Sequence, residues 1–275
     1  MHKLITQIFI IFFFLGCSTL TYYSPRNKVS SIMLLDPSSD VYAYVNLSKN
    51  RFIYDDLDFK YKIGVNSVGN LYFSYTKDPE SFSSVITGNF PKNIFWGMQN
   101  NSNFKSKGNI LTNPKWQVKN SNVYITPTKD KTGILINQRE ITHKNENILT
   151  TQIDTLEKNE MFLWIRDVAL LLPNNISKKN LIPFNSATLV VNSTNAVDYH
   201  LKAYLTTNNP TISSILSKKL IPILLENTTK IIISSPIKSR VQDRSTVELE
   251  FSVEKTSVKE FVSTLLYQES KKNNC

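Results

Sequence analysis

The stretch LYFSYTKDPESFSSVI, residues 71–86, and the stretch LEFSVEKTSVKEFVSTLL, residues 249–266, resemble each other and decide the expected fold. Each opens with alternating apolar and polar residues, the pattern of a half-buried strand. Asp78-Pro79 then predicts a helix start, because aspartate caps free amides and proline fits the first helical position. Ser257 and Glu260 have the spacing of a capping box. Both stretches therefore predict a strand followed by an amphipathic helix. The apolar face of the first helix would be Phe82, Val85 and Ile86, and that of the second would be Val258, Phe261, Val262, Leu265 and Leu266.

The two stretches have similar surroundings. A β-rich segment precedes each of them, Val41–Leu47 in one half and Ala187–Asn192 in the other. The matched segments occur in the same order in both halves of the chain, which favours an internal duplication. The alternative is chance similarity between strand-then-helix pieces drawn from a narrow alphabet. The expected fold class is α+β, antiparallel sheets with helices packed on one face, in two units that could be related: residues 32–142 and 161–275, separated by the polar stretch 143–160.

Two further helices are expected. Met161–Pro173 is apolar on nearly all sides and too short to span a bilayer, so it predicts a buried helix, with an interfacial membrane segment as the alternative. A helix starting at Asn209-Pro210 should bury Ile212, Ile215, Leu216 and Leu220 and expose Lys218-Lys219. Strands are expected at Val197–Thr207 and Arg244–Lys255, and three short ones between Trp116 and Ile141.

The beginning of the chain predicts export. Lys3 precedes an apolar run, Leu4–Leu15, which has the length of a signal-peptide core and is shorter than the roughly 20 residues of a spanning helix. The run ends at Leu15-Gly16-Cys17. These residues resemble the lipobox of bacterial lipoproteins, and Phe14 in place of leucine resembles the looser boxes of spirochaete lipoproteins. The alternatives are an ordinary secretory signal and an uncleaved anchor helix.

The resemblance implies a signal peptide over residues 1–16, cleavage before Cys17, and lipid attachment at Cys17 followed by a tether to residue 31. Three acyl chains exceed what stable anchoring requires. The implied location is the cell envelope. Ser18 is not the aspartate that retains enterobacterial lipoproteins at the inner membrane, which favours the outer membrane, facing either the periplasm or the outside.

Composition and charge limit the possible partners. The chain is 41% hydrophobic and 20% charged, as folded proteins are, and its net charge is +10. That charge permits attraction to anionic lipid or acidic polymer, although the basic residues are scattered and a merely solvated surface is the alternative. Nucleic acid is not expected as a partner of an exported chain. With Cys17 acylated, Cys275 is left as a free thiol at the chain end.

Catalytic motifs are missing from the sequence. It contains no GxSxG, HExxH, CxxC, P-loop or dinucleotide fingerprint, so no enzyme activity, cofactor or metal site is predicted. His143 and His200 have no ligand at metal spacing. Some weaker candidates have simpler structural readings: an acidic turn at Asp55, Asp56 and Asp58, a partnered buried charge at Arg166 and Asp167, and unmodified NxS/T triplets at Asn46, Asn175, Asn192 and Asn227.

The function expected from the sequence is that of a non-catalytic, lipid-anchored envelope protein that binds another envelope component. The alternative is a surface adhesin or receptor that uses its basic residues to bind an acidic host or envelope polymer.

Overall fold

The computed structural model describes residues 29–32, 34–54, 67–90, 94–108, 114–128, 133–138, 158–168, 184–211, 213–215, 217–218, 222 and 230–260. The chain divides into two compact units. The first contains Met1–Ser39, Tyr44–Asp154 and Leu266–Cys275, and the second contains Asp40–Ala43 and Thr155–Leu265. The acidic turn at Asp55, Asp56 and Asp58 and the boundary stretch 143–157 lie outside the described residues.

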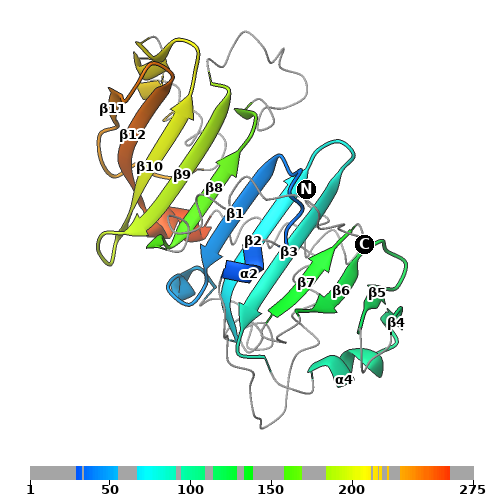
Figure 1. Ribbon diagram of the computed structural model, residues 1–275. Helices are drawn as coiled ribbons and strands as arrows, with labels where there is room; N and C mark the ends of the chain where they lie inside the picture. The colour runs from blue at the N-terminus through cyan, green and yellow to red at the C-terminus, as the bar shows by residue number, and fades with distance from the viewer. Residues whose placement is uncertain are drawn as a thin grey trace. The chain divides into compact units, whose positions relative to one another are not determined.

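The expected α+β class is wrong. The strands form one 12-stranded antiparallel sheet, in the order β11-β12-β10-β9-β8-β1-β2-β3-β7-β6-β5-β4 (Figure 1). The described helices and helical turns in the first unit are short: α2 (Val29–Ile32), the 3-10 turn η1 (Arg51–Tyr54) and α4 (Ile94–Gln99). Strand pairing, rather than helices packed on separate small sheets, therefore organises the described chain.

In the first unit, the strands run β2 (Val68–Thr76), β3 (Ser81–Gly88), β7 (Gly133–Asn137), β6 (Tyr124–Pro127), β5 (Trp116–Val118) and β4 (Phe104–Ser106). The predicted helix at Asp78-Pro79 is absent. Instead these two residues, joined by a cis peptide bond, lie in the turn of the β2–β3 hairpin. All eight residues of β3 are buried. Because both faces of this strand are covered, the alternation that identifies a half-buried strand is lost.

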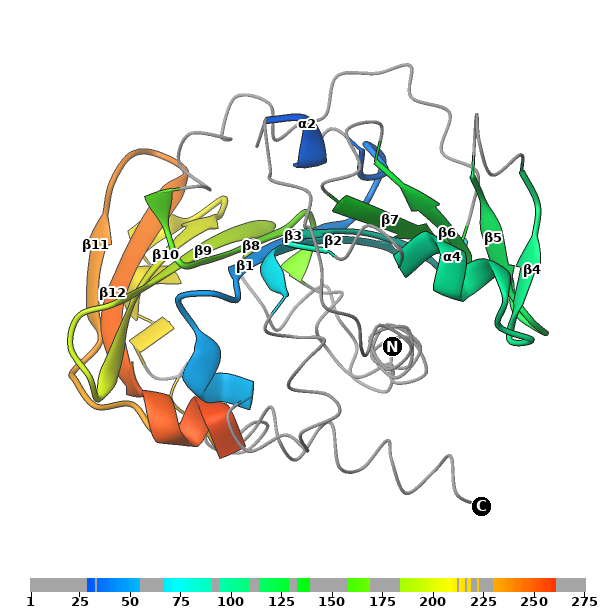
Figure 2. The ribbon, with the colours of Figure 1, turned by 90° about the horizontal axis from the view of Figure 1, so that it is seen from below.

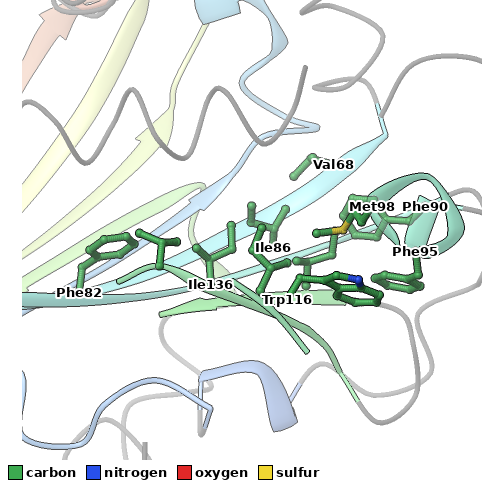
Figure 3. Close-up of a cluster of buried hydrophobic side chains, with 11 residues drawn as sticks. Val68, Phe82, Ile86, Phe90, Phe95, Met98, Trp116 and Ile136 are labelled. Atoms are coloured by element: carbon green, nitrogen blue, oxygen red, sulfur yellow. The ribbon is translucent and has the colours of Figure 1, made fainter. Parts of the chain in front are cut away.

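One face of this unit holds its hydrophobic core (Figure 3). Ile86 lies opposite Leu71 on one side and Ile134 on the other, and Ile125 lies opposite Ile136 and Trp116, so these side chains share a face. Phe95 of α4 stacks on Trp116, with ring centroids 5.7 Å apart. The short helix α4 thus covers the β5 end of the core.

The opposite face of the first unit is more polar. Tyr72, Ser74, Ser83 and Thr87 lie on it, and α2 contacts β3 there (Figure 2). Thr76 Oγ1 donates to Ser39 Oγ at 3.3 Å. The segment that follows the predicted tether is therefore attached to this face.

The second unit contains β8 (Met161–Ile165), β9 (Ser186–Ser193), β10 (Asp198–Thr206), β12 (Thr246–Glu254) and β11 (Lys238–Val241), and β1 (Val41–Asn46) is divided between the units. Burial in β10 alternates strictly: Tyr199, Leu201, Ala203 and Leu205 are buried and their neighbours are partly exposed. Their partners on β12 are Val253, Phe251, Leu249 and Val247. The strands predicted at Val41–Leu47, Ala187–Asn192, Val197–Thr207 and Arg244–Lys255 are confirmed.

The helix predicted at Met161–Pro173 is wrong at its start, because Met161–Ile165 is the strand β8. Phe162 and Ile165 lie on opposite faces of β8 and both are buried. An apolar strand buried on both faces has no period-two pattern to separate it from a buried helix.

The helix predicted at Asn209-Pro210 is present in its described residues and exposes Lys218 as expected, but Ile215 is exposed instead of buried. Its described residues between 210 and 218 are helical, with Ser213 and Ser217 fully buried and Ile215 60% exposed. Ser213 and Thr207 share a hydrogen bond of 2.7 Å between their hydroxyls. A local hydrogen-bond network, which the apolar pattern does not reveal, fixes the orientation of this helix.

The final helix begins at 255 in the described residues, so Ser257 lies in its first turn and is not its cap. Ser257 Oγ donates to Glu254 O at 2.8 Å and accepts from Ile232 N at 3.0 Å. A helix thus follows β12, whereas the strand β3 follows β2. The predicted equivalence of the stretches at Leu71 and Leu249, and with it the duplication, is wrong.

Candidate functional site

Charged side chains gather on one face of the β10–β12–β11 strands in the second unit. Cross-strand pairing sets the rows: His200 lies opposite Ser252, Glu250 lies between Lys202 and Lys238, and Glu248 lies between Tyr204 and Arg240. Residues directly opposite in a ladder share a face. We call this set, His200, Lys202, Tyr204, Lys238, Arg240, Glu248, Glu250 and Ser252, the charged face.

His200 is held by a carboxylate on this face. Its Nε2 lies 3.0 Å from Glu250 Oε1, and both side chains are partly exposed. Ser252 lies opposite His200, but the structure gives the described His200 and Ser252 side chains no hydrogen bond to each other. Ser252 instead uses its backbone N–H to donate to Ser235 Oγ at 2.7 Å. A histidine and a carboxylate are thus paired, with the serine hydroxyl not joined to them.

Arg240 and Glu248 form the shortest ion pair of the charged face. Arg240 Nε and Nη2 donate to Glu248 Oε2 at 2.8 and 2.6 Å. The hydrogen bond with Glu248 and the attraction of its charge raise the pKa of Arg240 above its ordinary value. The Glu248 side chain is only 5% exposed and the Arg240 side chain is 73% exposed. The guanidinium therefore reaches over the buried carboxylate from the outer strand.

Lys202 and Lys238 lie on either side of Glu250. Glu250 pairs with His200, and within the described residues neither lysine forms an ion pair. The charged face contains three cationic side chains, Lys202, Lys238 and Arg240, and two anionic ones, Glu248 and Glu250. This arrangement can attract an acidic group to the outer part of the sheet.

The sequence indicated only part of this site. His200 lies within the predicted strand Val197–Thr207, and the sequence places no metal ligand beside it. The pairing of that strand with Val197–Thr207, which brings His200 to Glu250, depends on contacts far apart in the chain. Register across such distances could not be read from one strand alone.

The other candidate residues have structural roles where they are described. Arg166, expected in a buried helix beside Asp167, follows β8 and lies 3.8 Å from Asp40, with its side chain 44% exposed. Asn46 Oδ1 accepts bonds from Ser48 and Lys49 in a turn, and Asn192 binds Asn159 and Glu160. Cys17, His143, Asn175, Asn227 and Cys275 lie outside the described residues.

Within the part of the chain that the structure describes, no three residues among His, Cys, Asp and Glu are grouped so that they could hold a metal ion. None of the helices in these same ranges combines the length and the apolar character needed to cross a bilayer.

Solved structures provide a likeness of fold. Three crystal forms of TP0453 are similar to this chain. Form III has a TM-score of 0.59 and 10% sequence identity, and the match covers 87% of this chain and 100% of that chain. Form I has a TM-score of 0.57 and 14% identity, with 88% and 99% of the two chains covered, and form IV has a TM-score of 0.56 and 12% identity, with 86% and 97% covered. No family model matches the chain, and no curated protein matches it. The similarity extends over nearly the whole length of both chains.

Proposed function

We propose that the protein is a lipid-anchored component of a bacterial cell envelope, held by acyl chains on Cys17, with a non-catalytic binding role. The observation that carries the proposal is the apolar run Leu4–Leu15 ending at Leu15-Gly16-Cys17. Three acyl chains would retain the protein at a membrane without a spanning helix. The fold shared with TP0453 is compatible with this assignment.

Incorporation of radiolabelled palmitate tests the anchor. The wild-type chain should take up label and partition into detergent, and Cys17→Ala should do neither. Cys275→Ala is the matched control, because it removes the other cysteine and should leave labelling unchanged. Equal labelling of wild type and Cys17→Ala would refute the assignment.

The geometry around His200 supports the proposed non-catalytic role. A serine nucleophile needs a base within hydrogen-bond reach, and here the imidazole bonds a carboxylate while no bond joins it to Ser252. A fluorophosphonate probe, which labels activated serines, should leave Ser252 unmodified. Labelling of Ser252 that disappears in His200→Gln would show that the protein has a serine-hydrolase site.

Lys202 and Lys238 support a second candidate function, binding of an acidic polymer. These two cations lie on one sheet face beside Arg240, in a chain of net charge +10. Heparin should then retain the protein at low salt and release it as ionic strength rises. The double variant Lys202→Gln/Lys238→Gln should elute earlier than Lys105→Gln/Lys107→Gln, which removes two exposed lysines elsewhere.

A further inference from the structure

The outer edge of β11 presents backbone groups that are ready to pair with another strand. β11 ends the strand order and has β12 as its neighbour. Gln242 N donates to Thr246 O at 3.0 Å, and in an antiparallel ladder the bonded pairs alternate along the strands. Arg240 and Lys238 therefore exchange bonds with β12, whereas the N–H and C=O groups of Ser239 and Val241 point away from it. Over the described ranges, no backbone group bonds these outward groups.

Two of the four side chains along this edge, Lys238 and Arg240, are exposed and basic. Lys238 and Arg240 alternate with Ser239 and Val241, so both cations lie on the charged face. Val241 is 46% exposed on the opposite face. A strand added beside β11 would bring its alternate side chains next to Lys238 and Arg240 on one face and next to Val241 on the other.

We propose that the edge of β11 is a docking strand for an extended peptide segment of another protein, with acidic side chains at alternate positions. Backbone bonds to Ser239 and Val241 would supply affinity, and the charges of Lys238 and Arg240 would select acidic residues. The proposal depends on the binding role given above and is independent of the anchor at Cys17.

A second copy of this chain is a poorer occupant of the same edge. In a two-fold antiparallel pairing centred on Ser239, Lys238 lies opposite Arg240 of the partner subunit, and like charges directly opposite are destabilising. Pro236 and Lys238 are residues of the kind that protect edge strands from self-pairing. The same features that oppose self-association favour an acidic partner.

Proline substitution tests the backbone bonds selectively. Ser239→Pro removes an outward N–H and leaves the ladder bonds of β12 in place. It also removes the hydroxyl that bonds Ser214 O at 3.1 Å, so Ser239→Ala is the matched control, which loses the hydroxyl and keeps the N–H. The probe is a fluorescein-labelled peptide alternating valine and glutamate, bound to the full chain in nonionic detergent and followed by fluorescence anisotropy.

Wild type and Ser239→Ala should bind the probe, and Ser239→Pro should bind about tenfold more weakly, as expected for loss of a net hydrogen bond. Replacing glutamate by lysine in the peptide should abolish binding. Should Ser239→Pro fail to fold, N-methylation of alternate peptide amides tests the same bonds on the wild-type chain. Equal binding of methylated and unmethylated peptides, or of Ser239→Pro and Ser239→Ala, would overturn the proposal. So would self-association of the wild-type chain that Ser239→Pro abolishes.

Discussion

Ser74 of β2 lies directly opposite Ser83 of β3, and both hydroxyls are buried with no hydrogen-bond partner among the described residues. The two residues are 0% and 1% exposed. An unsatisfied buried polar group costs about 1–3 kcal/mol relative to a satisfied one. These two hydroxyls therefore offset part of the stability that the sheet gains by burying the polar face of the first unit.

Replacing one of these serines should not weaken the fold. Ser83→Ala removes an unsatisfied hydroxyl and should leave the free energy of unfolding unchanged or raise it. Its neighbour Ser84, on the other face, donates to Tyr72 O at 3.0 Å, so Ser84→Ala should lower that free energy by about 0.5–1.5 kcal/mol. Urea unfolding measures both. A loss for Ser83→Ala as large as that for Ser84→Ala would show that the Ser83 hydroxyl has a partner.

Gly88 should tolerate no side chain. A Cβ atom there would lie 2.1 Å from Ser67 O and 2.8 Å from Val68 Cα, both backbone atoms. Gly88→Ala should therefore lower the free energy of unfolding by about 1–3 kcal/mol or more, as overpacking does. Gly97→Ala in α4 is the control, since a Cβ there meets nothing within 4 Å and alanine favours helix. Equal thermal midpoints for the two variants would contradict this packing.

Tyr199 should make stability decline at alkaline pH. Its side chain is buried, and desolvation, with a smaller contribution from the charge of Glu160, raises its pKa above the ordinary value. The folded state then keeps the phenol neutral, while the unfolded state releases its proton above a pH of about 10. The contribution of Tyr199 to the free energy of unfolding is complete below that pH. It is lost as the pH rises towards the folded-state pKa, by up to about 1.4 kcal/mol per pH unit.

The variant Tyr199→Phe isolates this effect from the titration of lysines. Above pH 10 the free energy of unfolding of this variant should fall less steeply with pH than that of the wild type. The difference between the two slopes should be up to about 1.4 kcal/mol per pH unit, the value for release of one proton. Parallel curves for the two proteins would mean that Tyr199 ionises equally well in the folded state.

Arg240 should stabilise the fold mainly by compensating Glu248. Arg240→Ala leaves a carboxylate with 5% side-chain exposure without its guanidinium, so the urea midpoint should fall. Adding Glu248→Gln to Arg240→Ala should recover part of the loss, because the uncompensated charge is gone. A double variant less stable than Arg240→Ala would contradict this explanation.

The strand β10, which has one partly exposed face, could be predicted from the sequence, whereas β3 and β8, which bury residues on both faces, could not. In β10, the buried residues Tyr199, Leu201 and Ala203 alternate with partly exposed ones, because only one face of this strand is buried. In β3, Phe82 and Ile86 face the core while Ser83 and Val85 are buried on the other side, so the spacing of apolar residues also fits a helix. Which faces are covered is decided by segments far away in the chain.

Helix orientation and the charged face were equally hidden from local patterns. Ile215 was predicted to be buried because it continues an apolar stripe, yet the bond between Ser213 and Thr207 turns the serines inward. His200 and Glu250 meet because β10 pairs with β12 in one particular register. Local spacing gives neither the hydrogen-bond partners of a serine nor the register of two distant strands.

The mass of the mature N-terminal peptide shows whether Cys17 carries the lipid anchor. The protein should be purified from membranes, digested, and its first peptide analysed by mass spectrometry. If Cys17 is the lipid anchor, this peptide begins at Cys17 and carries the added mass of a diacylglycerol and an amide-linked acyl chain. A peptide that begins at another residue, or an unmodified Cys17, would contradict the anchor at Cys17.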